Sequence, residues 1–216
     1  MTNRYDPPIV LEPEQSARAC VIWMHGLGAD GNDFVPIVPQ LGLPENLGVR
    51  FVFPHAPVQP VTINGGYQMR AWYDILKADL EREIDLVGVA ESVAYLQQLV
   101  DDQLAAGIAL DQMILAGFSQ GGVVALDCAL QMPQKPAGVL ALSTYLAQAR
   151  GEGAGLQVFQ AHGTQDPVVP MQTGMAARTG LEALGANVTW HEYPMPHSVH
   201  PTEIMDIGNW LRARLG

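Results

Sequence analysis

The stretch Gly117-Phe118-Ser119-Gln120-Gly121 constrains the fold of this chain more than any other part of it, because it lies between an apolar run at 113–116 and an apolar helical stretch. Glycines two residues before and two after the serine remove side chains that would clash in a tight strand-to-helix turn. Such a turn lifts the serine hydroxyl clear of a sheet and points the free N–H groups of the next helix at it. The pattern therefore predicts Ser119 as a nucleophile, and the alternative interpretation is a purely structural glycine-rich turn.

Short apolar runs rich in β-branched residues alternate with helical periodicity, which is typical of a mostly parallel sheet with helices on both faces. The runs are uniformly apolar, as expected of strands covered on both sides. Apolar spacing predicts helices after Ser119, over about 89–104 with an end at Gly107, over about 171–184, and over 204–215. Neither a repeat nor a linker interrupts the 216 residues, so we expect one domain spanning 1–216. The predicted strands are 20–24, 49–53, 113–116, 138–142, 156–160 and 188–193.

The segment 54–75 matches none of these elements and is rich in proline, glycine and aromatic residues. Long irregular segments inside compact domains are often functional. Two interpretations stay open: the segment forms a wall of a binding site, or it is a surface excursion packed by its own aromatic side chains.

The formal net charge of −11 argues against nucleic acid or an anionic membrane as a partner, because both would repel the chain. No apolar run approaches the roughly 18 residues that a membrane span needs, and the first twenty residues lack the layout of a signal peptide. We therefore expect no stable membrane insertion and a cytoplasmic location.

In a fold with this turn, the acid and then the base should follow the serine along the chain, at the carboxyl ends of strands. Asp166 follows the predicted strand 156–160, whereas Asp127, Glu203 and Asp206 fall on predicted helices. We expect Asp166 to orient the base. The alternative role for Asp166 is to cap the helix that begins near Pro170.

Two histidines, His197 and His200, follow the predicted strand 188–193. His197 lies nearer the end of the strand, and Pro201 starts the last helix directly after His200. We expect His197 to act as general base toward Ser119 and as general acid toward the leaving group. A metal site is the competing interpretation for these histidines, but no cysteine or carboxylate cluster completes one, so we predict no metal.

Acyl transfer also needs two backbone donors for the developing oxyanion. One is expected to be the N–H of Gln120, which follows the nucleophile, and the other the N–H of Leu27 in the glycine-rich loop 23–31. That loop lacks the spacing of a nucleotide-binding loop. His25 and His162 each end a predicted strand before a glycine, and we expect them to support loops by hydrogen bonding.

Several motifs, in this order, together resemble those of the phospholipase/carboxylesterase family, which includes bacterial carboxylesterases and acyl-protein thioesterases. The resemblance implies an α/β-hydrolase fold without a large lid domain, the triad Ser119, Asp166 and His197, and oxyanion donors at Leu27 and Gln120. It also implies an apolar acyl site near Leu27, Trp72 and Val168. The family usually has glycine before the histidine, where this chain has Pro196, and proline fixes φ near −65°. The motifs are His25-Gly26-Leu27-Gly28-Ala29-Asp30, Val61-Thr62-Ile63-Asn64-Gly65-Gly66-Tyr67, Trp72-Tyr73-Asp74, Gly117-Phe118-Ser119-Gln120-Gly121-Gly122, His162-Gly163, Asp166-Pro167-Val168-Val169-Pro170 and the turn at His197.

Together these features predict a serine carboxylesterase that hydrolyses small-molecule esters or thioesters through an acyl-enzyme and needs no cofactor. Within enzymes, the alternative is an acyl-protein thioesterase or lysophospholipase. In a different class, the alternative is a non-catalytic module that binds an acyl ligand. A homodimer stays open, because nothing in the sequence selects a contact.

Overall fold

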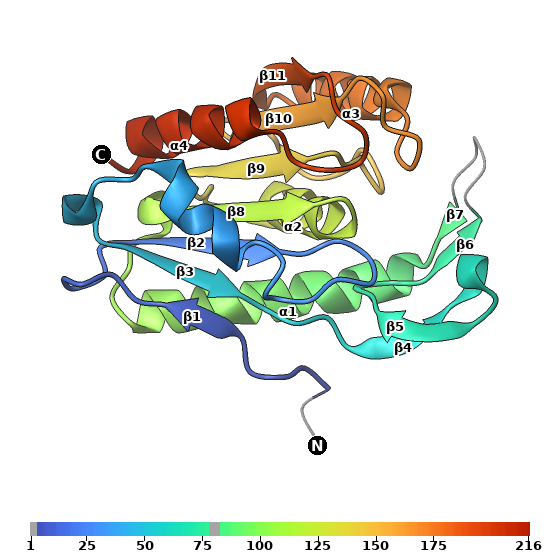
Figure 1. The fold of residues 1–216 in the computed structure, drawn as a ribbon, viewed down its shortest axis with the longest axis horizontal. Helices are drawn as coiled ribbons and strands as arrows, with labels where there is room; N and C mark the ends of the chain where they lie inside the picture. The colour runs from blue at the N-terminus through green and yellow to red at the C-terminus, as the bar shows by residue number, and fades with distance from the viewer. Residues whose placement is uncertain (1–3, 78–82) are drawn as a thin grey trace.

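A seven-stranded sheet forms the centre of the computed structural model, which describes residues 4–77 and 83–216 (Figure 1). The strand order is β1-β3-β2-β8-β9-β10-β11, and every neighbouring pair is parallel except β1 with β3. This is the α/β-hydrolase fold that the sequence predicts, and the described residues form no large lid domain. The strands are β1 (Ile9–Leu11), β2 (Ala19–Met24), β3 (Val49–Phe53), β8 (Met113–Phe118), β9 (Gly138–Leu142), β10 (Gln157–Gly163) and β11 (Asn187–Tyr193).

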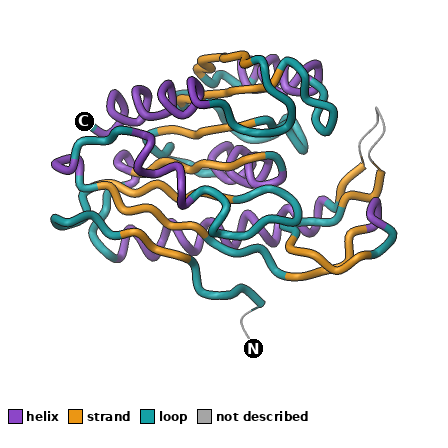
Figure 2. The backbone as a smooth tube through the Cα atoms, viewed as in Figure 1, coloured by secondary structure: helices purple, strands orange, loops and turns teal. Residues whose placement is uncertain are grey.

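Helices cover both faces of the sheet, and the side chains of each strand alternate between the two sides. In β2, Cys20, Ile22 and Met24 pack into one core with α1 (Leu86–Ala105), α2 (Gln120–Gln131) and α3 (Met171–Ala183). The intervening residues of β2 pack into a second core with α4 (Pro201–Leu215) and the 3₁₀ helix η1 (Val35–Leu41), which lie side by side (Figure 2). Coverage on both sides explains why the strands are apolar throughout.

All six predicted strands and all four predicted helices are present. Two strands run further at their carboxyl ends than expected, since β8 continues to Phe118 and β10 to Gly163. Gly107 follows α1 with a φ of 89°, and its N–H donates to the Leu104 carbonyl, as expected of a left-handed residue that ends a helix. The edge strand β1 was not predicted, because three half-exposed residues carry little pattern.

The expectation that segment 54–75 holds no regular element was wrong. The segment contains the antiparallel hairpin of β4 (Val58–Val61) and β5 (Tyr67–Arg70), and a 3₁₀ turn η3 (Thr62–Asn64) joins the two strands. Gly65 and Gly66 adopt φ values of 66° and 78°, which let the chain reverse there. A second pair, β6 (Ile75–Lys77) with β7 (Glu83–Ile84), follows directly. These strands are short and mostly exposed, so they lack the apolar runs that reveal central strands.

Within residues 4–77 and 83–216, no helix combines the length and the apolar character that a membrane span requires.

Candidate active site

Ser119 lies in the turn between β8 and α2 and has a strained backbone with a positive φ of 54° and a ψ of −118°. Its N–H donates to the Leu142 carbonyl at 2.9 Å, and its carbonyl accepts from the Thr144 hydroxyl at 2.7 Å. A Cβ atom at Gly117 would lie 2.2 Å from the backbone of Gly121. The turn therefore requires glycine at position 117. The two hydrogen bonds to residues at and just beyond the end of β9 hold the strained serine in place.

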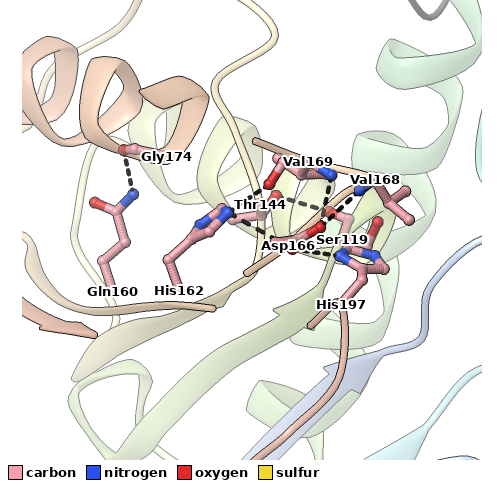
Figure 3. Close-up of polar contacts among 9 residues, drawn as sticks. All are labelled: Ser119, Thr144, Gln160, His162, Asp166, Val168, Val169, Gly174 and His197. Atoms are coloured by element: carbon pink, nitrogen blue, oxygen red, sulfur yellow. Dashed lines mark hydrogen bonds and ion pairs between the residues drawn. The ribbon is translucent and has the colours of Figure 1, made fainter. Parts of the chain in front are cut away.

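Asp166 lies three residues beyond the end of β10 and has a fully buried side chain. Its Oδ1 accepts from the N–H groups of Val168 and Val169 at 2.8 and 2.9 Å, and its Oδ2 accepts from His197 Nδ1 at 2.7 Å (Figure 3). Burial alone would raise the pKa of this carboxyl, but the hydrogen bonds, with the one from His197 foremost, hold it below its ordinary value. The side chain is thus a carboxylate at neutral pH.

His197 follows β11, and its side chain is 15% exposed, so one edge of the ring reaches solvent. Figure 3 shows the ring beside Ser119, with Nδ1 turned toward Asp166. The backbone at Pro196 has a negative φ, since Ser119 and Ser143 are the non-glycine residues with positive φ among those described. A backbone angle that only glycine can adopt would have been incompatible with Pro196. Proline can adopt the backbone found here, so the change from glycine to proline does not displace His197.

The other histidine of this loop, His200, has a different place in the structure. It is the N-cap of α4, where its Nδ1 accepts from the Thr202 N–H at 3.2 Å. In return, the Glu203 carboxylate accepts from the His200 N–H at 3.0 Å, which completes a capping box. The structure therefore brings His197, and not His200, to Asp166.

A cavity of about 550 Å³ opens onto this group of side chains. Both expected oxyanion donors line it, and Gln120 is the first residue of α2, where an N–H has no partner within the helix. Val168, which the sequence assigns to the acyl site, also lines the cavity and is 51% exposed. The lining residues are Gly26, Leu27, Ala29, Asp33, Ile63, Ile75, Phe118, Ser119, Gln120, Pro167, Val168 and His197.

Trp72, the remaining residue assigned to the acyl site, is fully buried and is not among the residues that line the cavity. Its indole N–H donates to the His25 carbonyl at 2.8 Å. Its backbone N–H donates to the side-chain oxygen of Gln120 at 3.1 Å, and the Gln120 amide nitrogen donates to the Tyr73 carbonyl at 2.8 Å. Trp72 therefore supports the wall from behind, and Ile63 and Ile75 of the same region supply its surface.

The hydrogen bonds of Gln120 were not predicted. The sequence identifies its backbone N–H from its position after Ser119. The side chain, however, bonds to the backbone of two residues that precede it by 48 and 47 positions in the chain. A contact at that separation leaves no periodic signal in the sequence. The one available hint is that a polar residue occupies a buried position at the start of an apolar helix.

His25 and His162 support loops, as expected. His25 Nδ1 donates to the Gly26 carbonyl at 2.7 Å, and its Nε2 accepts from the Ala56 N–H at 3.0 Å. Burial lowers the pKa of His25 to about 4, so the ring is neutral at pH 7. His162 Nε2 donates to the Val169 carbonyl at 2.8 Å, and burial lowers its pKa too. The His25 ring thus holds the glycine-rich loop 23–31, and the His162 ring holds the loop that contains Asp166.

In the part of the chain that the structure describes, no three His, Cys, Asp or Glu residues gather closely enough to hold a metal ion.

Comparison with known proteins gives concordant results. The family model described as Phospholipase/Carboxylesterase matches residues 6–215. Acyl-protein thioesterase 1 of Neurospora crassa is 36% identical over 225 residues, which cover 97% of this chain and 92% of that protein. The crystal structure of SOBER1 of Arabidopsis thaliana superposes with a TM-score of 0.86 at 30% identity, covering 93% of this chain and all of that one. Acyl-protein thioesterase 2 of Zea mays also reaches a TM-score of 0.86, at 27% identity, covering 98% of this chain and all of that one.

Proposed function

Because the chain belongs to the phospholipase/carboxylesterase family and is a hydrolase of the esterase and thioesterase class, we propose that it is a serine carboxylesterase that works through an acyl-enzyme. Ser119 is the nucleophile, His197 the base and Asp166 the residue that orients the base. The observation that carries the proposal is the 2.7 Å hydrogen bond between His197 Nδ1 and Asp166 Oδ2, beside a strained serine at the mouth of a cavity.

Acylation begins when Ser119 Oγ attacks the carbonyl carbon of the ester and its proton passes to His197 Nε2. Asp166 accepts from Nδ1, which leaves Nε2 free to take that proton and stabilises the imidazolium that forms. The N–H groups of Leu27 and Gln120 donate to the oxyanion. His197 then gives the proton to the leaving oxygen or sulfur.

Deacylation repeats the sequence with water in place of the serine. His197 takes a proton from the water, whose oxygen attacks the acyl carbon, and Ser119 leaves with the proton restored. Besides the substrate and water, each step uses side chains and backbone groups of this chain.

A second candidate function, acyl-protein thioester hydrolysis, is favoured by the names of the curated relatives that match almost the whole chain. The apolar side chains along the cavity would accommodate an acyl chain in either case. The two candidates differ in the length of acyl chain and the leaving group that they turn over fastest.

The test is hydrolysis of nitrophenyl esters of graded acyl length by the wild type and by Ser119→Ala and His197→Ala. We expect each substitution to lower kcat by on the order of 10⁴–10⁶. The matched control is His200→Ala, which removes the neighbouring histidine and should retain most of the activity. Loss of activity in His200→Ala but not in His197→Ala would show that the base is misassigned.

Each acyl chain is then offered both as an oxygen ester and as a thioester. Faster turnover of short oxygen esters would support the carboxylesterase, and a rate that rises with chain length on thioesters would support the acyl-protein thioesterase. A wild type that turns over no member of either series, and that does not react with a fluorophosphonate at Ser119, would instead be a module that binds acyl ligands.

A further inference from the structure

A smaller cavity of about 270 Å³ adjoins the one already described. Asp33, Phe118 and His197 line both cavities and so form their common boundary. The Phe118 ring lies 4.6 Å from the His197 ring and 5.8 Å from the Phe34 ring, measured between centroids. The remaining lining residues of the smaller cavity are Phe34, Ile37, Ser198 and Val199.

The two cavities differ in which reactive groups they contain. Ser119 and the two oxyanion donors, Leu27 and Gln120, line only the larger one, whereas His197 lines both. The carbonyl group of a substrate must lie with the serine and the donors, so its acyl chain occupies the larger cavity. The leaving atom must lie within reach of the proton on His197. Because His197 also lines the smaller cavity, that cavity offers a place into which the leaving group can extend.

Asp33 gives this boundary a negative charge. Among the described residues that line either cavity, it is the one acidic side chain, and neither lysine nor arginine is present. It precedes η1 in a turn where its N–H donates to the Asp30 carbonyl at 3.1 Å. Partial burial and the neighbouring charge of Asp30 raise the pKa of Asp33, so measurements at pH 8 ensure that the carboxyl is ionised.

We propose that the smaller cavity receives the leaving group and that Asp33 makes it select leaving groups with a positive charge, such as a thiol or alcohol that bears an ammonium group. This inference rests on the proposed function. In the acylation step, Ser119 Oγ bonds to the carbonyl carbon and the bond from that carbon to the leaving sulfur breaks. The serine proton reaches the sulfur through His197, and the neutral thiol departs past Asp33 with its ammonium group unchanged.

The experiment compares three butyryl thioesters of similar leaving-group length whose leaving groups carry a positive, a neutral or a negative end, at pH 8 and low salt. The thiols are thiocholine, which is cationic, 3,3-dimethylbutanethiol, its neutral isostere, and 2-mercaptoethanesulfonate, which is anionic. For the wild type, we expect kcat/KM to fall by about 3–10-fold per step from cation to neutral to anion, because one partly exposed charge acts at short range. Added salt should reduce these differences in kcat/KM, because it screens the charge of Asp33.

Asp33→Asn should reduce the preference for the cationic over the neutral thioester by about 3–10-fold. Asp33→Lys should reverse the order. The matched control is Glu45→Gln, which removes one negative charge from a residue that lines neither cavity and should leave the ratios unchanged. Thermal unfolding of each variant checks that it is folded.

Either of two outcomes would overturn the subsite. One is a wild type whose kcat/KM values do not follow the charge of the leaving group. The other is an Asp33→Asn variant with the same kcat/KM ratios among the three thioesters as the wild type. Both leave the proposed function intact, because the neutral thioester is still hydrolysed. A wild type that hydrolyses the nitrophenyl esters but none of these three thioesters would overturn the subsite alone, and one that hydrolyses neither set would overturn the proposed function as well.

A change of shape tests the placement independently of charge. Val199→Phe should fill part of the smaller cavity, and it leaves the larger one untouched. We expect KM to rise with the size of the leaving group at a fixed acyl chain, while the profile over acyl length at a small leaving group keeps its shape. A shifted acyl-length profile would place the acyl chain in the smaller cavity and contradict the assignment.

Discussion

At the scale of single residues, the orientation of His197 depends on one buried carboxylate. Asp166 uses one oxygen to accept two backbone N–H groups and the other to accept from His197. The backbone of its own loop therefore holds the carboxylate in place independently of its contact with His197. This arrangement fixes which ring nitrogen faces the serine.

Asp166→Asn tests that role. The amide can still contact the ring, but its NH₂ group favours the wrong tautomer, so we expect kcat to fall by on the order of 10³–10⁴ with a small change in KM. Asp127→Asn is the matched control, since Asp127 is a buried carboxylate on α2 that pairs with Arg150 at 3.2 Å, away from the cavity. It should lower stability while kcat stays near that of the wild type. Equal losses of kcat in both variants would mean that the effect is one of folding.

At the scale of elements, the turn from β8 to α2 is a junction packed too closely for side chains at three of its glycines. A Cβ atom at Gly121 would lie 2.3 Å from the Met24 carbonyl oxygen, and one at Gly122 would lie 2.6 Å from the Thr144 side chain. Helix α2 can therefore approach β2 and the loop after β9 only because these positions lack side chains. That approach sets where the Gln120 N–H lies relative to Ser119.

Gly117→Ala should disrupt this junction, because its Cβ would overlap the backbone of Gly121 at 2.2 Å. We expect the free energy of unfolding to fall by about 1–3 kcal/mol or more, and esterase activity to fall further than the folded fraction does. In the control, Gly180→Ala on α3, the new methyl meets the end of the Leu146 side chain at 3.0 Å and the Ala149 Cβ at 3.9 Å, and alanine favours a helix by up to about 1 kcal/mol. Urea unfolding and nitrophenyl ester hydrolysis measure the two effects. Full activity in Gly117→Ala would contradict the required close approach.

At the scale of the whole molecule, the docking of α4 against the sheet buries a carboxyl group. Glu203 is fully buried in the first turn of α4, and burial raises its pKa from 4.5 to about 7. Between these two values the folded chain keeps a proton that the unfolded chain has lost. The contribution of Glu203 to the free energy of unfolding therefore falls as pH rises from about 4.5 to about 7. Above pH 7 the folded chain bears the full cost of burying the ionised carboxylate.

Glu203→Gln should remove that cost and keep an oxygen that accepts from the His200 N–H. We expect the free energy of unfolding to rise by roughly 1–3 kcal/mol at pH 8, and by much less at pH 5. Urea unfolding at the two pH values measures the difference, and the exposed Glu14→Gln serves as the control. The same difference from the wild type at both pH values would show that titration of Glu203 is not the cause.

The central strands and the four helices could be predicted because burial on both faces leaves long apolar runs in the sequence. The strands β1 and β4 to β7 could not, because they are short and largely exposed, so solvent permits almost any side chain there. Ser119, Asp166 and His197 could be nominated because each lies where a strand ends, which is where α/β sheets gather reactive groups. The buried place of Trp72 and the position of Asp33 between two cavities depend on contacts across the fold, which the order of residues does not record.

The side chain of Gln120 has a consequence for attempts to change substrate preference in the laboratory. Its amide bonds to Trp72 and Tyr73 of the wall, while its own backbone N–H lines the cavity beside Ser119. A library of variants around Trp72 would therefore also alter the placement of an oxyanion donor, so selectivity and turnover would change together. Ile63 and Val168 form the surface of the same cavity without this link, and screening there should separate the two properties.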